Sequence, residues 1–311
     1  MKTMIIDCNY LSYQAFYTMR DLDHDGVPSG VVFGFLNRLL YLGHQFRSNR
    51  FALCWDSRKS YRRMEYSEYK SHRREHTDDE LATYSILWEQ MDELKYHILQ
   101  EIGFNNIFEQ WGIEADDLMA WIAERVPDSV IVTSDEDLFQ CLTEETEIFN
   151  PSSKKSWTKR SFEIEYGIHP KDWWRVKAIG GCSSDNVKGV AGVGEKKAIQ
   201  WITRKMNPDT KTFEKIEAAI EAGLIDRNES LVRLPHPATK DLDICEDDFD
   251  IEGLKFVAQR YGMNSFIEGP QFKRWEDLFA GDFQVVEDRS ASARHERKQT
   301  TNKIRDRRRK R

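Results

Sequence analysis

Residues 129–137 read SVIVTSDED, an apolar run that ends in Asp135 and Asp137. Two more runs have the same form: TMIID at 3–7 ends in Asp7, and FALCWD at 51–56 ends in Asp56. Short apolar runs of this kind are typical of buried parallel strands. Helical patterns at 10–20, 31–46 and 79–102 alternate with them. This order predicts an α/β fold with a mostly parallel central sheet and helices on both faces.

The whole chain has 311 residues, enough for one large domain or two modest ones. Its apolar runs are too short to span a membrane, and Asp7 and Asp21 stand where a signal peptide would be apolar. Its five cysteines lack the spacing of a zinc site, which argues against one and suits a reducing compartment. We therefore expect a monomer in the cytoplasm, that of the host if the protein is viral.

Charge is unevenly distributed along the chain. Residues 289–311 contain eleven lysines and arginines against two acids, so the other 288 residues carry −16 of charge under a net charge of −7. The segment has almost no apolar residues, which predicts a disordered basic tail. It is either a solvated end or a contact for nucleic acid.

A further acidic group lies in GIEADDLMAWIAERV, residues 112–126, which predicts a helix with Glu114, Asp116 and Asp117 in its first turn. One acid there would be explained by the helix dipole. Ligands of a parallel sheet bind beyond the carboxyl ends of its strands, where the other acids also lie. Seven carboxylates together would repel one another unless divalent cations neutralise them, and oxygen ligands select Mg²⁺ or Mn²⁺. Two such ions promote in-line hydrolysis of phosphodiester bonds.

Two stretches offer contacts for a polyanion. Residues 58–74, RKSYRRMEYSEYKSHRR, combine cations for phosphates with tyrosines that can stack on an unpaired base. Residues 180–198, GGCSSDNVKGVAGVGEKKA, place glycines before a lysine-bearing helix start, a combination that favours phosphate. Each stretch alone would be a solvated face or an ordinary turn, but their positions beside the acids favour a nucleic-acid site.

In this order the motifs resemble the structure-specific 5′ nuclease family: flap endonucleases, the 5′-nuclease domain of DNA polymerase I and stand-alone phage 5′–3′ exonucleases. The resemblance covers roughly residues 1–268. It is carried by IDCNYLSYQAFY, WDSRKSYRRMEYSEYKSHR, GIEADDLMAW, VTSDEDLFQ and SDNVKGVAGVGEKKA.

The resemblance implies three parts of the chain. Residues 1–167 would form an α/β nuclease domain with a helical arch at about 58–103. Residues 168–288 would form a helical duplex-binding region with a helix-three-turn-helix element, and residues 289–311 the tail.

The resemblance also assigns roles to residues. Lys70 and Arg73 match the arch cations that grip the scissile phosphate, with Arg62 and Tyr69 beside them on DNA. The hairpin 189–197 would bind duplex phosphate, in the family often with a K⁺ ion, through the N–H groups of Gly192, Val193 and Gly194 and the charges of Lys196 and Lys197. The metal ligands would be Asp7, Asp56, Glu114, Asp116, Asp117, Asp135, Asp137 and Asp185.

The chain departs from the family at Cys182. The family has Gly-Asp-x-x-Asp-Asn here, whereas this chain has Gly181-Cys182 followed by Asp185-Asn186. A protonated thiol is a poor ligand for Mg²⁺. Of the two expected ions, the second is therefore expected to be weaker, bridged by water or held by Asp185.

These features together predict a Mg²⁺-dependent 5′–3′ exonuclease and 5′-flap endonuclease. Its substrate would be branched or 5′-ended duplex DNA or an RNA–DNA hybrid. It would work in replication or repair beside a separate DNA polymerase or single-strand-binding protein. One alternative is a catalytically weak DNA-structure-binding protein with an impaired second metal site. Another is a single-strand RNase, against which the duplex-binding hairpin argues.

Overall fold

The protein is described by a computed structural model over residues 1–71 and 77–283. Within these residues the main sheet has six strands in the order β5-β4-β1-β6-β7-β8. Five strands run parallel, and β8 (Lys155–Trp157) is antiparallel to its neighbour. The parallel strands are β1 (Thr3–Asp7), β4 (Arg50–Cys54), β5 (Ile107–Phe108), β6 (Ser129–Val132) and β7 (Thr146–Asn150). The mostly parallel sheet is confirmed, and the three predicted strands form its centre.

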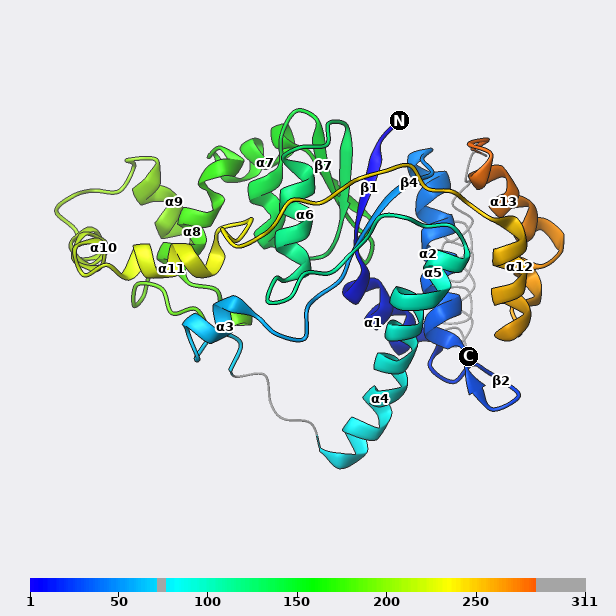
Figure 1. Cartoon of the computed structure of the whole chain (residues 1–311). Coiled ribbons are helices and arrows are strands. Elements are labelled where there is room, and N and C mark those ends of the chain that lie inside the picture. Colours follow the sequence, from blue (N-terminus) through cyan, green and yellow to red (C-terminus); the bar gives the residue numbers. More distant parts are fainter. Residues whose placement is uncertain (72–76, 284–311) are drawn as a thin grey trace, which may run out of the picture.

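Helices cover both faces of this sheet (Figure 1). Alternate residues of β1 enter two separate cores, with Met4 and Ile6 on one side and Ile5 on the other. The first core contains α1 (Cys8–Met19), α2 (Gly30–Phe46), α12 (Ile251–Arg260) and α13 (Gly269–Phe279). The second contains α6 (Ala115–Ala123), α7 (Lys159–Tyr166), α8 (Trp173–Gly180), α9 (Glu195–Ile202), α10 (Lys211–Glu221) and α11 (Leu224–Val232).

The region of the predicted arch begins with α3 (Tyr61–Glu65) and ends with α4 (Asp78–Glu93), and residues 72–76 between them lie outside the described part of the chain. Thr77 and Glu80 form the capping box expected from the sequence. The long helix predicted for 79–102 is present as one continuous helical stretch, in which a π-helical turn at Leu94–Ile98 lies between α4 and α5 (Leu99–Glu101). In Figure 1, α4 extends away from the body of the protein.

The predicted region 168–288 is divided between the two faces of the sheet. Helices α8 to α11 stay together, and the chain then crosses to the other face, where Trp275 and Leu278 of α13 are fully buried in the first core. On the way it follows the β5 edge, where Asn106 Nδ2 donates to the Cys245 carbonyl at 2.9 Å and Gln110 Nε2 to the Lys240 carbonyl at 2.9 Å. This segment covers an otherwise open strand edge. The tail predicted at 289–311 lies outside the described residues.

The remaining elements are short. Strands β2 (Asp23–His24) and β3 (Val27–Pro28) form a two-residue-deep hairpin. Short 3-10 helices occur at Glu136–Cys141, Pro170–Asp172, Ser183–Asp185 and Asn264–Phe266. A search of the described helices for one of sufficient length and apolarity to cross a membrane finds none.

Candidate metal centre and nucleic-acid contacts

The acids predicted at the strand ends meet at one edge of the sheet. Asp7 ends β1 and also caps α1, because its carboxylate accepts the Tyr10 N–H at 2.9 Å. Asp56 follows β4 and accepts the Ala115 N–H at 2.8 Å, which ties the start of α6 to that strand. Asp135 follows β6 and caps the 3-10 turn after it. Parallel strands and a short helix thus deliver these side chains to the same place.

Asp116, in the first turn of α6, interacts with these three acids, and we call Asp7, Asp56, Asp116 and Asp135 the carboxylate subsite. Desolvation, with the negative charge of Asp56, raises the pKa of Asp7 to about 7. Desolvation, with the charges of Asp135 and Asp7, raises the pKa of Asp116 well above its ordinary value. These carboxyl groups therefore resist being ionised together at neutral pH, and a nearby divalent cation would favour their ionised forms.

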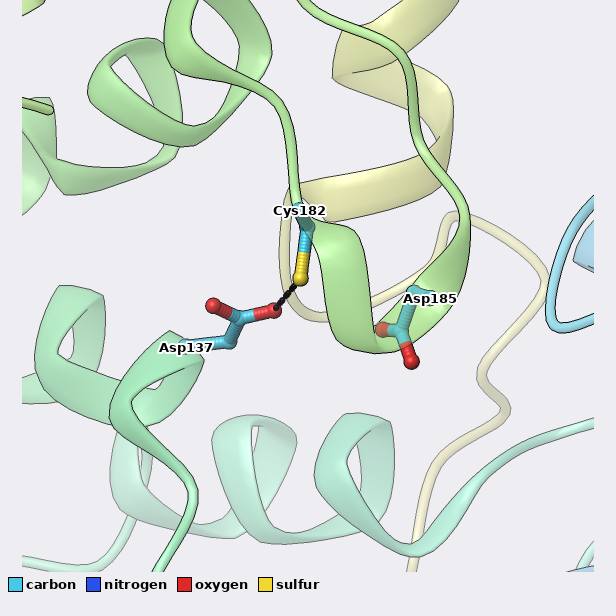
Figure 2. Close-up of side chains that lie close together, drawn as sticks. All are labelled: Asp137, Cys182 and Asp185. Carbon is cyan, nitrogen blue, oxygen red and sulfur yellow. Dashed lines mark hydrogen bonds between the residues drawn. The ribbon is translucent and has the colours of Figure 1, made fainter. Parts of the chain in front are cut away.

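Asp137, Cys182 and Asp185 form a second group, the thiol subsite (Figure 2). One ligand atom of each lies within 4.8 Å of the others, and Cys182 Sγ is 3.7 Å from Asp137 Oδ2. Desolvation and the charge of Asp135 raise the pKa of Asp137 to about 6, against the opposing effect of Lys177. Burial and the charge of Asp137 raise the pKa of the Cys182 thiol to about 11. Cys182 and Asp185 share one loop, but Asp137 lies 45 residues before Cys182 in the chain, so cysteine spacing alone could not reveal a thiol in a ligand set.

A short loop holds the thiol subsite against the base of the predicted arch. Cys182 and Val187 exchange backbone hydrogen bonds of 3.0 and 2.9 Å, which close the loop between them. The Lys70 N–H then donates to the Asp185 carbonyl at 2.8 Å, and Asn186 Nδ2 donates to the Glu68 carbonyl at 2.8 Å. These hydrogen bonds join the loop that carries Asp185 to the segment that carries Lys70.

Lys70 lies between the two subsites. Its Nζ is 2.8 Å from Glu114 Oε2 and 3.9 Å from Asp185 Oδ1. Burial lowers the pKa of Lys70, but the carboxylates of Glu114 and Asp185 outweigh burial and raise it above its ordinary value. Burial likewise raises the pKa of Glu114, and Lys70 and Arg62 outweigh it and lower it. Glu114 is thus ionised and already paired with the Lys70 ammonium. Arg73, predicted beside Lys70, lies outside the described residues.

The structure corrects two predictions made from the sequence. Arg62 was expected to contact DNA, and Asp117 was expected to bind a metal ion. The Arg62 guanidinium binds Asp117 through both nitrogens, Nη1 to Oδ2 at 2.5 Å and Nη2 to Oδ1 at 2.7 Å. Their side chains are 3% and 0% exposed. Asp117 also accepts the His236 N–H at 2.7 Å. Because each charge is satisfied and shielded from solvent, neither residue is available to a phosphate or to a metal ion.

The structure also corrects the prediction for Tyr69. It was predicted to stack on a base, but it is only 2% exposed and packs among Ala178, Val187 and Leu231. Its hydroxyl donates to Glu114 Oε2 at 3.0 Å. Burial, together with the charge of Glu114, raises the pKa of this hydroxyl, so Tyr69 is a neutral donor that orients Glu114.

Lys177 is a residue of the site that sequence reasoning missed. Its Nζ is 3.3 Å from Asp137 Oδ1 and 3.1 Å from Glu195 Oε1. Burial lowers the pKa of Lys177, but the carboxylates of Asp137 and Glu195 together outweigh burial and raise it. Lys177 lies one helical turn before Gly181, in the helix that leads into the glycine-rich loop. This position is the sequence feature that could have identified Lys177 as a residue of the site.

The loop from α8 to α9 has the form of the predicted hairpin. Gly189 passes so close to the preceding backbone that a Cβ there would lie 2.3 Å from the Gly181 nitrogen, and Gly192 has a φ of +80°. Both positions favour glycine. The predicted N–H of Val193 donates instead to the Val190 carbonyl at 2.9 Å. Among the described residues no backbone acceptor takes the N–H of Gly192 or Gly194, and Lys196 and Lys197 are exposed beside them.

Comparison with known proteins gives a consistent result. The model of the 5′-3′ exonuclease N-terminal resolvase-like domain matches residues 2–167. The 5′-3′ exonuclease of Buchnera aphidicola is 29% identical over 221 residues, 69% of this chain and 74% of that protein. The 5′-3′ exonuclease of Bacillus subtilis is 31% identical over 214 residues, 65% of this chain and 69% of that protein. A DNA polymerase I of Mycobacterium tuberculosis is 30% identical over 211 residues, 64% of this chain but only 22% of the polymerase.

Solved structures share the fold. A bacteriophage T5 5′-exonuclease with bound zinc ions superimposes with a TM-score of 0.65 at 19% identity, covering 91% of this chain and 100% of that one. Flap endonuclease-1 from Methanococcus jannaschii superimposes with a TM-score of 0.55 at 14% identity, covering 90% and 92%. At these identities the match establishes the common architecture of sheet and helices.

The buried pair Arg62–Asp117 generates a stability prediction. We expect Asp117→Asn to lower the free energy of unfolding by about 3–5 kcal/mol, since it leaves a buried guanidinium without its counter-charge. The double variant Arg62→Leu/Asp117→Leu is expected to lose less than the sum of the two single leucine variants. Urea denaturation measures these differences.

The matched control is Glu144→Ala, which removes an ion pair to Lys159 in which Glu144 is 82% exposed. It is expected to change stability little, because solvent screens such a pair. Additive losses in the double variant would contradict the coupling of Arg62 to Asp117.

Proposed function

This chain belongs to the 5′–3′ exonuclease family of nucleases, and we propose that it cleaves branched or 5′-ended duplex DNA as a 5′–3′ exonuclease and 5′-flap endonuclease that depends on Mg²⁺ or Mn²⁺. The observation that carries the proposal is the carboxylate subsite, in which desolvation and neighbouring acids raise the pKa values of Asp7 and Asp116. Such a set of oxygen donors fits a hard divalent cation.

In this proposal Asp7, Asp56, Asp116 and Asp135 hold one ion, and the thiol subsite holds the other. Divalent ions in such a site activate water and stabilise charge on the attacking and leaving oxygens of a phosphodiester. Asp7 and Asp56 are fixed for this task by the Tyr10 and Ala115 N–H groups that they accept. Their orientation is thus set before substrate binds.

Lys70 would bind and orient the scissile phosphate. Its ammonium is held at 2.8 Å by Glu114, which in turn accepts the Tyr69 hydroxyl. Its backbone has a left-handed φ of 53° and donates to the Asp185 carbonyl. A fixed positive charge beside both subsites stabilises the charge that develops on non-bridging phosphate oxygens. We propose the same role for Arg73, which lies outside the described residues.

The hairpin 189–197 would bind the duplex at a distance from the cut. The N–H groups of Gly192 and Gly194, with the charges of Lys196 and Lys197, suit a phosphate oxygen, and a K⁺ ion at this hairpin is part of the proposal. Such contacts position the duplex without reading its sequence.

We further propose action on RNA–DNA hybrids and work as a monomer during replication or repair, beside a separate DNA polymerase or single-strand-binding protein. The names of the matched exonucleases and polymerases support this role. All five cysteines are unpaired, which suits the cytoplasm, that of the host if the protein is viral. The replacement of an acid by Cys182 favours one alternative, a DNA-structure-binding protein with weak catalysis.

The carboxylate subsite is tested by Asp116→Ala and Asp135→Ala. We expect either change to abolish Mg²⁺-dependent cleavage of an end-labelled 5′-flap substrate, because each removes a metal ligand. Affinity for the flap should change little, since cations and backbone N–H groups provide most DNA contacts. Glu124→Ala is the matched control, because Glu124 lies at the opposite end of α6 and is 52% exposed. Near-normal cleavage by Asp116→Ala or Asp135→Ala would contradict the assignment, and an inactive but DNA-binding wild type would favour the alternative.

Lys70→Ala tests the role of the ammonium. It is expected to reduce the single-turnover rate of flap cleavage at least about a hundredfold, the usual scale for losing one preorganised electrostatic contact. Lys59→Ala removes an exposed cation of the same stretch and should change mainly DNA affinity. If Lys70→Ala weakened binding and left the rate unchanged, Lys70 would belong to a general basic surface.

A further inference from the structure

We propose that the thiol subsite selects a thiophilic divalent cation, of the Zn²⁺, Co²⁺ and Cd²⁺ class, over Mg²⁺. The chain would then hold two chemically different ions, a hard ion in the carboxylate subsite and a softer one at Asp137, Cys182 and Asp185. The inference rests on the proposed function, because it concerns the second ion of the same centre. It concerns this chain's own residue 182.

The donor set carries the first part of the argument. Asp137 and Asp185 offer carboxylate oxygens and Cys182 offers sulfur, and the three donors converge in Figure 2. Mixed sulfur and oxygen donors suit Zn²⁺ and similar ions, whereas Mg²⁺ demands oxygen. Mg²⁺ would find only two carboxylates here. A thiophilic ion gains a third anionic ligand, because it displaces the thiol proton to solvent as the metal–sulfur bond forms.

The spacing of the donors carries the second part. Cys182 Sγ and Asp137 Oδ2 are 3.7 Å apart. Sulfur and oxygen ligands of a tetrahedral Zn²⁺ are separated by about 3.5 Å, since the metal–ligand bonds are about 2.3 and 2.0 Å. The separation therefore needs almost no change to admit such an ion.

The surroundings of the sulfur distinguish Cys182 from a cysteine that only fills space. Its Sγ contacts two polar groups, Asp137 Oδ2 at 3.7 Å and Ser184 Oγ at 2.9 Å. The paired backbone hydrogen bonds to Val187 fix the loop that presents it. Cys141, in contrast, is buried in the second core among side chains such as Leu138 and Leu142. Cys182 packs against apolar neighbours on one side and presents its thiol to carboxylates on the other.

The local charge suits a divalent ion in this place. Lys177 Nζ is 3.3 Å from Asp137 Oδ1, and Lys70 Nζ is 3.9 Å from Asp185 Oδ1. Each carboxylate thus has one oxygen near an ammonium. A thiolate would add a further negative charge close to Lys177, which is already shared by Asp137 and Glu195. A divalent ion bound to the thiolate balances that charge.

The experiment is a titration of the full-length protein with Co²⁺ in the presence of excess Mg²⁺, followed by absorption. Thiolate bound to Co²⁺ gives a charge-transfer band in the near ultraviolet. We expect wild type to show this band, saturating at one Co²⁺ per chain, and Cys182→Ser to lose it. Cys245→Ser is the matched control and should keep the band, since Cys245 is exposed and far along the chain. Circular dichroism establishes that each variant is folded.

Cys182→Asp supplies the converse change. It gives the subsite only oxygen donors. The Mg²⁺ concentration that displaces half of the bound Co²⁺ should therefore be at least about tenfold lower than for wild type, the lower end of the change in metal affinity that altering a metal site produces. No charge-transfer band in wild type, or an unchanged band in folded Cys182→Ser, would overturn the proposal. If wild type cleaves the flap in Mg²⁺ but shows no charge-transfer band with Co²⁺, the proposal for the thiol subsite is refuted and the proposed nuclease function is not. A Cys182-dependent band without cleavage in any metal refutes the nuclease function and leaves the metal site standing.

Discussion

Mutual repulsion among carboxylates at one edge of a parallel sheet is the constraint on which this structure depends. Burial raises the pKa values of Asp7, Asp116 and Asp137, and the charges of neighbouring carboxylates raise them further. Within the described residues, two buried ammonium groups, Lys70 and Lys177, contact carboxylates of the edge and offset part of it. The remainder creates a place for divalent cations. Without cations, the acidic site lowers the free energy of unfolding. Cation binding raises it again, so metal affinity is coupled to stability.

Short polar connections join the proposed metal centre to the segments that we propose contact DNA. The loop with Asp185 is bonded to the segment with Lys70 through backbone groups, and the buried Arg62–Asp117 pair joins α3 to α6. Arg62 Nη2 also donates to the Arg233 carbonyl at 3.1 Å, so the end of α11 belongs to the same connection. Arg62 and Tyr69 were first assigned to DNA. They instead hold in place other residues, which in this proposal contact the DNA or the metal ions.

Local patterns in the sequence predicted what depends on local structure. The strands ending in Asp7, Asp56 and Asp135 and the Thr77–Glu80 capping box follow from short-range periodicity and helix-end chemistry. The pairing of Arg62 with Asp117 and the burial of Tyr69 depend on tertiary packing between segments far apart in the chain. The return of α12 and α13 to the first core likewise depends on tertiary packing. The place of Cys182 was predictable because it keeps the motif spacing, whereas its partner Asp137 required the folded structure.

Thermal unfolding with and without divalent metal tests the central claim most directly. The melting temperature would be measured in Mg²⁺ or Mn²⁺ and in NaCl of equal ionic strength, for wild type and for Asp116→Asn. The account predicts that the divalent ion stabilises wild type beyond the ionic-strength control, by about 2.7 kcal/mol when the ion is at 100 times its Kd. It also predicts a smaller increment for Asp116→Asn, which has lost a ligand and part of the repulsion. Equal melting temperatures of wild type in the two salts would contradict the account, because the acidic edge would then hold no ion.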